Sequence, residues 1–148
     1  MSTFTQIIYH IIFSTKDRKP VLSSDNREKF FRYVWGILKK RNCFLYRINC
    51  VEDHVHILIS LHPSVALADL VKDIKIATSN WIKEGEVFPK FDHWQDGYGA
   101  FTYSIKEKDT LIEYIKGQEE HHKKVMFYDE FKRLLIESGI EFDEKYLK

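Results

Sequence analysis

The 148-residue sequence predicts one α+β domain, residues 1–148, in which the elements follow the order strand, helix, strand, strand, helix, strand. Two segments carry apolar residues at helical spacing, and four short segments are rich in β-branched and aromatic residues. A short turn joins the second and third strands, which should therefore form an antiparallel hairpin. This is the order of the ferredoxin-like βαββαβ fold, an antiparallel sheet with both helices on one face, and two further helices follow it.

The first expected strand, Phe4–Thr15, is hydrophobic along nearly its whole length, which is typical of a central strand. A basic loop with Lys16, Arg18 and Lys19 follows it directly. Because three cations cluster within four positions, this loop is either a solvated turn or a segment that contacts phosphate.

Two amphipathic helices are expected at residues 23–41 and 63–83, each with an apolar stripe that should pack in the core. The other face of the second helix carries Lys72 and Lys75, which is more commonly a solvated face than a phosphate-binding one. The long segment 85–99 then carries four large aromatic residues. These residues either stack on unpaired bases or pack over the edge of the domain.

The third expected strand, residues 52–61, carries two histidines one residue apart. Side chains alternate between the faces of a strand, so Val55 and Ile57 line one face while His54 and His56 lie side by side on the other. Such a pair can bind one metal ion or one phosphate, although two half-exposed histidines bonded to water or backbone fit the same pattern. If the helices cover the apolar face, the histidines lie on the open face, and another element must complete a site.

Composition limits the class of protein. The formal net charge is only +1, so any nucleic-acid surface must be a local patch. The sequence has neither a long apolar run nor a secretory signal pattern, which predicts a cytoplasmic protein without a membrane partner. Cys43 and Cys50 are too few for a disulfide framework and lack zinc-site spacing, so both are expected to be reduced.

A candidate lid for the histidine pair lies near the C-terminus. A helix is expected from Thr110 to Lys124, and Tyr114, Gln118 and His121 fall at i, i+4 and i+7 on one of its faces. Tyr114 can therefore offer a phenol, and Gln118 a neutral oxygen ligand, to the same position. Gly117 lowers the helix propensity of this segment and is expected to make it more mobile.

These residues together resemble a known family. The strand motif His54-Val55-His56 and the later Tyr114-Ile115-Lys116-Gly117-Gln118 are similar to the HUH endonuclease superfamily. Within it they resemble the single-tyrosine transposases of insertion-sequence 200-like elements. The strand Tyr9–Thr15 with its basic loop, the segment Trp94–Phe101 and the run 119–122 also resemble that family, so the resemblance covers nearly the whole chain.

The resemblance implies that His54, His56 and Gln118 bind a divalent metal, Mg²⁺ or Mn²⁺, and that Tyr114 is the nucleophile. It implies a DNA transposase that cleaves and rejoins single-stranded DNA with hairpin ends through a 5′-phosphotyrosine, without a nucleotide cofactor. His121 and His122 could assist proton transfer or contact phosphate, but a cation is also favoured at the end of a helix, and both are left out of the catalytic set.

The resemblance also implies a homodimer, and the sequence leaves open whether the site is assembled within one subunit or between two. Dimerisation would join two small cationic patches along a shared DNA groove. The tentative DNA-binding residues in these patches are Lys16, Arg18, Lys19, Lys72 and Lys75.

Two other functions fit the residues. A metal-dependent phosphodiesterase or nuclease that activates water would keep His54, His56 and Gln118 but would not need Tyr114. A non-catalytic single-stranded nucleic-acid-binding module is the second, because ferredoxin-like sheets also bind single-stranded RNA. A domesticated relative of a transposase would share the active site and differ only in its cellular role.

Overall fold

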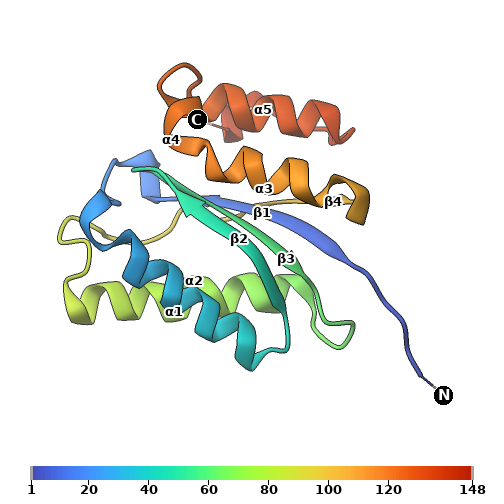
Figure 1. Ribbon diagram of the computed structural model, residues 1–148. Coiled ribbons are helices and arrows are strands. Elements are labelled where there is room, and N and C mark those ends of the chain that lie inside the picture. Colours follow the sequence, from blue (N-terminus) through green and yellow to red (C-terminus); the bar gives the residue numbers. More distant parts are fainter. Residues whose placement is uncertain (1, 148) are drawn as a thin grey trace.

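The computed structural model describes residues 2–147 and places a four-stranded antiparallel sheet between two layers of helices (Figure 1). The strands are β1 (Ile8–Ser14), β2 (Phe44–Cys50), β3 (His54–Ser60) and β4 (Gly99–Tyr103). Their order across the sheet is β2-β3-β1-β4, so β1 is central as its hydrophobicity predicts. The predicted α+β class and the ferredoxin-like order of elements are confirmed.

Helices α1 (Arg27–Lys40) and α2 (Leu67–Gly85) cover one face of the sheet (Figure 1). The main hydrophobic core lies between them and the strands, and it contains the fully buried side chains of Val55 and Ile57. A 3-10 turn precedes α1, and α2 begins a few residues later than the sequence predicts. Among the described residues, no helix combines the length and apolar character that crossing a membrane requires.

The opposite face of the sheet is also covered, by α3 (Lys108–Lys116), α4 (Gln118–His122) and α5 (Phe127–Glu137) (Figure 1). Two smaller hydrophobic clusters join these helices to β1, β3 and β4. The histidines lie on this second face, and the helices that lie across it leave both His54 and His56 0 % exposed. The C-terminal helices are the additional element that the site required.

The expected helix from Thr110 to Lys124 is two helices with a break at Gly117, whose φ of −88° and ψ of 15° are not helical. The first of them begins at Lys108, directly after a 3-10 turn (Ile105–Glu107) that a capping box of Ser104 and Glu107 starts. The Gly117 N–H still bonds to the carbonyl of Glu113. The chain therefore bends at the residue with the lowest helix propensity in the segment.

The long segment between α2 and β4 packs against the domain through its aromatic side chains. Phe88, Phe91 and Trp94 are buried in the main core, and the Trp94 indole N–H donates to the Thr78 hydroxyl at 2.9 Å. Tyr98 is the exception and is 40 % exposed. Packing at the domain edge, rather than base stacking, therefore accounts for three of the four aromatic residues.

Candidate active site

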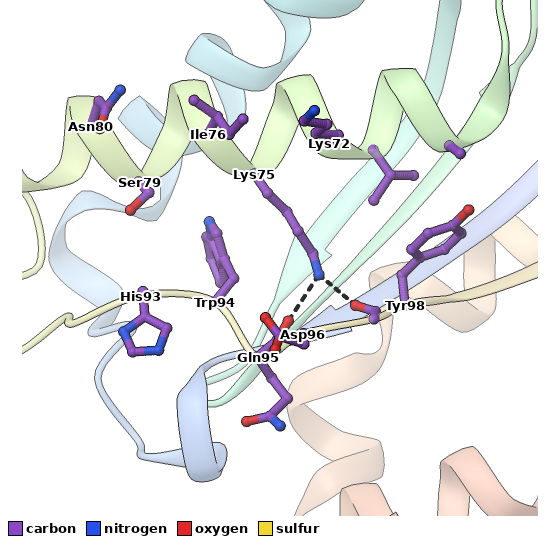
Figure 2. Close-up of a pocket in the computed structure, with 13 residues that line it drawn as sticks. Lys72, Lys75, Ile76, Ser79, Asn80, His93, Trp94, Gln95, Asp96 and Tyr98 are labelled. Carbon is purple, nitrogen blue, oxygen red and sulfur yellow. Dashed lines mark hydrogen bonds between the residues drawn. The ribbon is translucent and has the colours of Figure 1, made fainter. Parts of the chain in front are cut away.

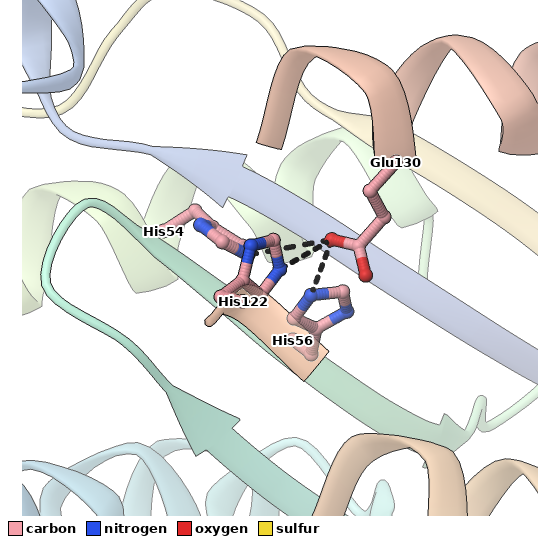
Figure 3. Close-up of side chains that lie close together, drawn as sticks. All are labelled: His54, His56, His122 and Glu130. Carbon is pink, nitrogen blue, oxygen red and sulfur yellow. Dashed lines mark hydrogen bonds and ion pairs between the residues drawn. The ribbon is translucent and has the colours of Figure 1, made fainter. Parts of the chain in front are cut away.

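His54 and His56 project from β3 into the layer between the sheet and the C-terminal helices. The His54 Nδ1 donates to Asp53 Oδ1 at 2.7 Å, and the His56 Nδ1 lies 2.8 Å from His10 Nε2. Each ring is therefore oriented through its Nδ1 atom. Both Nε2 atoms approach one carboxylate, that of Glu130 on α5 (Figure 3).

Glu130 is completely buried at the centre of the site. Its Oε1 lies 3.4 Å from His54 Nε2, 3.2 Å from His56 Nε2 and 3.0 Å from His122 Nε2 (Figure 3). Of these contacts, the one with His122 has the geometry of a hydrogen bond. Burial opposes the charge, but the surrounding histidines hold the pKa of Glu130 far below its usual range. The carboxylate is therefore an anion held among imidazoles.

The histidine pair has an asymmetric electrostatic environment. Burial alone would lower the pKa of His54, but the hydrogen bond to Asp53 and the nearby Glu130 raise it. Burial lowers the pKa of His56 to about 4, and the nearby His54 and His122 act in the same direction, although Glu130 opposes this. His56 is therefore a neutral ring at pH 7, which a metal ligand must be.

Tyr114 on α3 reaches the same carboxylate. Its hydroxyl donates to Glu130 Oε2, and its ring lies edge-on to His56 with the centroids 5.9 Å apart. Burial and the Glu130 carboxylate raise the pKa of Tyr114 well above its ordinary value. The phenol is thus next to the histidine pair and is held in its protonated form.

Gln118, at the start of α4, is also completely buried. Its Nε2 donates to the Tyr114 carbonyl at 3.3 Å, which ties the two sides of the Gly117 break together. Within residues 2–147, the Gln118 Oε1 has no hydrogen-bond partner. The Nε2 atoms of His54 and His56 lack one as well.

His122 and Glu130 lie near the histidine pair, and the sequence did not identify either as a site residue. The nitrogen atoms of His54, His56 and His122 and a Glu130 oxygen lie within 4.8 Å of one another, close enough to hold one metal ion. His122 is therefore part of the cluster and not a solvated cation at a helix end. Glu130 could have been suspected, because it lies on the apolar stripe of α5, three residues after Phe127.

The basic loop after β1 lies at the edge of this site. Asp17 and Arg18 both have a φ of 54°, in the left-handed region that non-glycine residues seldom adopt. This turn places the Arg18 guanidinium 5.2 Å from the centroid of the Phe127 ring, where burial lowers its pKa although Asp53 opposes this. Lys16 is half-buried and Lys19 is exposed in the same segment.

The two other candidate cations lie on α2, on the far side of the sheet from the histidines (Figure 1). Lys72 is exposed beside a groove of about 460 Å³ between α2 and segment 93–98. Lys75 crosses this groove and donates to the carbonyl oxygens of Gln95, at 2.8 Å, and Gly97 (Figure 2). Burial lowers the pKa of Lys75, although Asp96 opposes this. Lys75 therefore stabilises the loop in this structure.

Two solved structures share the fold. One is a Deinococcus radiodurans protein assigned as a transposase, with a TM-score of 0.64 and 23% identity, covering 80% of this chain and 95% of that one. The other is a REP-associated tyrosine transposase bound to a REP hairpin, with a TM-score of 0.63 and 13% identity, covering 84% of this chain and 76% of that one. At these identities the comparison establishes a transposase fold.

The sequence establishes the family. A family model described as "Transposase IS200 like" matches residues 3–118, and the chain belongs to the IS200-like transposases. The transposase of insertion sequence IS200 from Salmonella typhimurium is 28% identical over 124 residues, 78% of each chain. The ISDra2 transposase TnpA from Deinococcus radiodurans is 25% identical over 120 residues, 76% of this chain and 84% of that one. The predicted family is confirmed, and the family match ends before α5 and Glu130.

Proposed function

We propose that this transposase cleaves and rejoins single-stranded DNA at insertion-sequence ends through a 5′-phosphotyrosine at Tyr114, with the help of a divalent metal. The observation that carries the proposal is the position of the Tyr114 hydroxyl. The hydroxyl donates a hydrogen bond to the buried Glu130 carboxylate, which the Nε2 atoms of His54 and His56 also approach. A nucleophile and two neutral metal-binding nitrogens therefore face one anionic group, as they would face a scissile phosphate.

The metal ligands in this proposal are His54 Nε2, His56 Nε2 and Gln118 Oε1. Three buried polar atoms without hydrogen-bond partners support the assignment, because such atoms are costly unless a ligand satisfies them. Two imidazoles and an amide oxygen are neutral, mixed nitrogen and oxygen donors, a set that suits Mn²⁺ or Mg²⁺. A divalent ion held by these residues would supply a Lewis acid for the scissile phosphate and for the departing 3′ oxygen.

Tyr114 supplies the covalent step. Its phenol loses a proton and its oxygen forms a bond to phosphorus, while the bond from phosphorus to the 3′ oxygen breaks and leaves a 3′-OH. The 5′-phosphotyrosine keeps the energy of the phosphodiester bond. The 3′-OH of another strand can therefore attack the phosphotyrosine and rejoin the DNA without a nucleotide cofactor.

We further propose that the DNA partner carries hairpin ends and that the protein acts as a homodimer. The REP-associated transposase, which shares the fold, is bound to a hairpin, and this supports the choice of DNA. Arg18 lies beside Phe127 at the edge of the site, and Lys16 and Lys19 belong to the same loop, so in this proposal the loop contacts phosphates of the entering strand. Sedimentation equilibrium with and without hairpin DNA tests the dimer.

The decisive experiment uses labelled single strands copied from the DNA that flanks the gene, incubated with Mg²⁺ or Mn²⁺ and resolved on a denaturing protein gel. The expected result is a labelled band at the mass of the protein that disappears with Tyr114→Phe and with EDTA. Tyr33→Phe is the matched control, because Tyr33 stacks on Trp81 in the helical layer on the other side of the sheet.

Two other results of this experiment would favour the alternative functions. Cleavage that persists in Tyr114→Phe without a covalent band would favour a nuclease that activates water. Tight DNA binding without cleavage in either metal would favour a binding module.

A further inference from the structure

His10 lies beneath the metal-binding histidines and is not among the ligands proposed for the metal. It projects from β1 on the same sheet face as His56 and is 0 % exposed. Its Nε2 is 2.8 Å from His56 Nδ1, and the two rings are nearly parallel, with centroids 5.0 Å apart and an angle of 22° between their planes. The contact is therefore a directed hydrogen bond between two buried rings.

The rest of the environment of His10 is apolar and aromatic. The rings of Phe101, Tyr103 and Tyr114 surround it at centroid distances of 6.2, 6.5 and 6.2 Å. Its Nδ1 has no hydrogen-bond partner among the described residues. An aromatic hydrocarbon side chain would fill this space without burying an unpaired nitrogen, so packing alone does not explain a histidine here.

The hydrogen bond has a chemical consequence for His56. A neutral imidazole carries one N–H, so Nε2 can present a lone pair to a metal only when the proton is on Nδ1. The His56 Nδ1–H then needs an acceptor, and His10 Nε2 is the atom in position to accept it. Asp53 has the same relation to His54, whose Nδ1–H it accepts.

We infer that His10 is a positioning residue that holds His56 in the orientation and tautomer required for metal binding. The inference rests on the proposed function, because it concerns the same metal site. In this arrangement the proton of a neutral His10 ring is on Nδ1, because Nε2 accepts the hydrogen bond. Groups that orient a metal-binding histidine through its other nitrogen typically change metal affinity by about 10- to 100-fold.

The test measures Mn²⁺ binding to the full chain by titration calorimetry in the absence of DNA. His10→Phe keeps the ring and removes the acceptor, and it should weaken Mn²⁺ binding by about 10- to 100-fold. His10→Gln restores an acceptor oxygen and should recover part of the affinity. Phe101→Leu is the control, since it disturbs the same cluster of rings without touching the hydrogen bond.

The outcomes separate this inference from the proposed function. If a folded His10→Phe variant binds Mn²⁺ as tightly as the wild type does, the role of His10 is overturned and the proposed function is not. A wild-type protein that binds no Mn²⁺ would overturn the metal-assisted function.

Should His10→Phe fail to fold, long-range proton–nitrogen NMR spectra of the wild type with Mg²⁺ still decide the question. His10 protonated on Nδ1 supports the inference, and His10 protonated on Nε2 contradicts it.

Discussion

At the scale of single residues, the site combines a buried anion with neutral ligands. Glu130 is charged and fully buried, yet every nearby polar group that contacts it is an imidazole or a phenol. A buried carboxylate is stable only when such partners compensate its lost hydration. In the proposed function the same groups would face a phosphate, and in this structure the Glu130 carboxylate lies among them.

Cys50 allows a prediction at the same scale. Burial raises the pKa of the Cys50 thiol to about 12, and the side chain is 0 % exposed. About one Cys50 thiol in ten thousand would then be ionised at pH 8, and only the thiolate reacts. Iodoacetamide at pH 8 should leave Cys50 unmodified in the native protein and alkylate it in 6 M guanidinium, as mass spectrometry of tryptic peptides would reveal. Rapid native alkylation would contradict the buried position.

At the scale of elements, α5 places a carboxylate in the centre of the proposed site. The family match ends at residue 118, and α5 follows it with Glu130 directed at the histidines. The carboxylate and a scissile phosphate are both anions that would occupy the same space. If Tyr114 attacks DNA as proposed, α5 has to withdraw Glu130 before a phosphate can reach the hydroxyl.

Glu130→Gln should accelerate the cleavage of single-stranded DNA. A hydrogen bond to a charged group contributes about 1.5–3 kcal/mol, so weakening those that hold Glu130 in place should raise the rate about tenfold or more. Single-turnover cleavage in Mn²⁺ measures the change. Glu137→Gln is the control, because Glu137 is exposed on the same helix and contacts only Arg133 at 3.5 Å among the ion pairs described.

A slower Glu130→Gln enzyme with weaker Mn²⁺ binding would contradict this prediction. It would instead identify Glu130 as a metal ligand in the cluster with His54, His56 and His122.

At the scale of the whole molecule, a net charge of only +1 means that DNA binding depends on where the cations lie. The candidate cations divide between the loop that borders the active site and helix α2 on the other side of the sheet. Lys75 in the second group is engaged by two backbone carbonyls. The two groups should therefore respond differently to substitution.

DNA affinity should fall steeply as salt rises, because phosphate contacts release counterions. Lys16→Ala should reduce the slope of log affinity against log salt by about one. Lys75→Ala should leave this slope nearly unchanged and lower the melting temperature, since it releases segment 93–98 from α2. Fluorescence anisotropy over a range of NaCl concentrations, with thermal melts of each variant, measures both effects. An unchanged slope for Lys16→Ala would remove the basic loop from the DNA-binding surface.

The sequence by itself determined the strand and helix order, the alternation that pairs His54 with His56, and the helical spacing of Tyr114 and Gln118. These features follow from periodicities of two and 3.6 residues, which are local and can be read along the chain. The break at Gly117 was also foreshadowed locally, because glycine disfavours the helix.

Only the tertiary structure decided what surrounds the histidines. The bond from His10 to His56 joins residues 46 positions apart through strand pairing, and Glu130 reaches the pair by the packing of α5 across the sheet. Strand register and helix docking depend on the whole core, so no local pattern specifies which side chains they bring together. That Tyr114 and Gln118 come to lie near His54 and His56 was therefore predictable, whereas the contacts of His10 and Glu130 with the histidines were not.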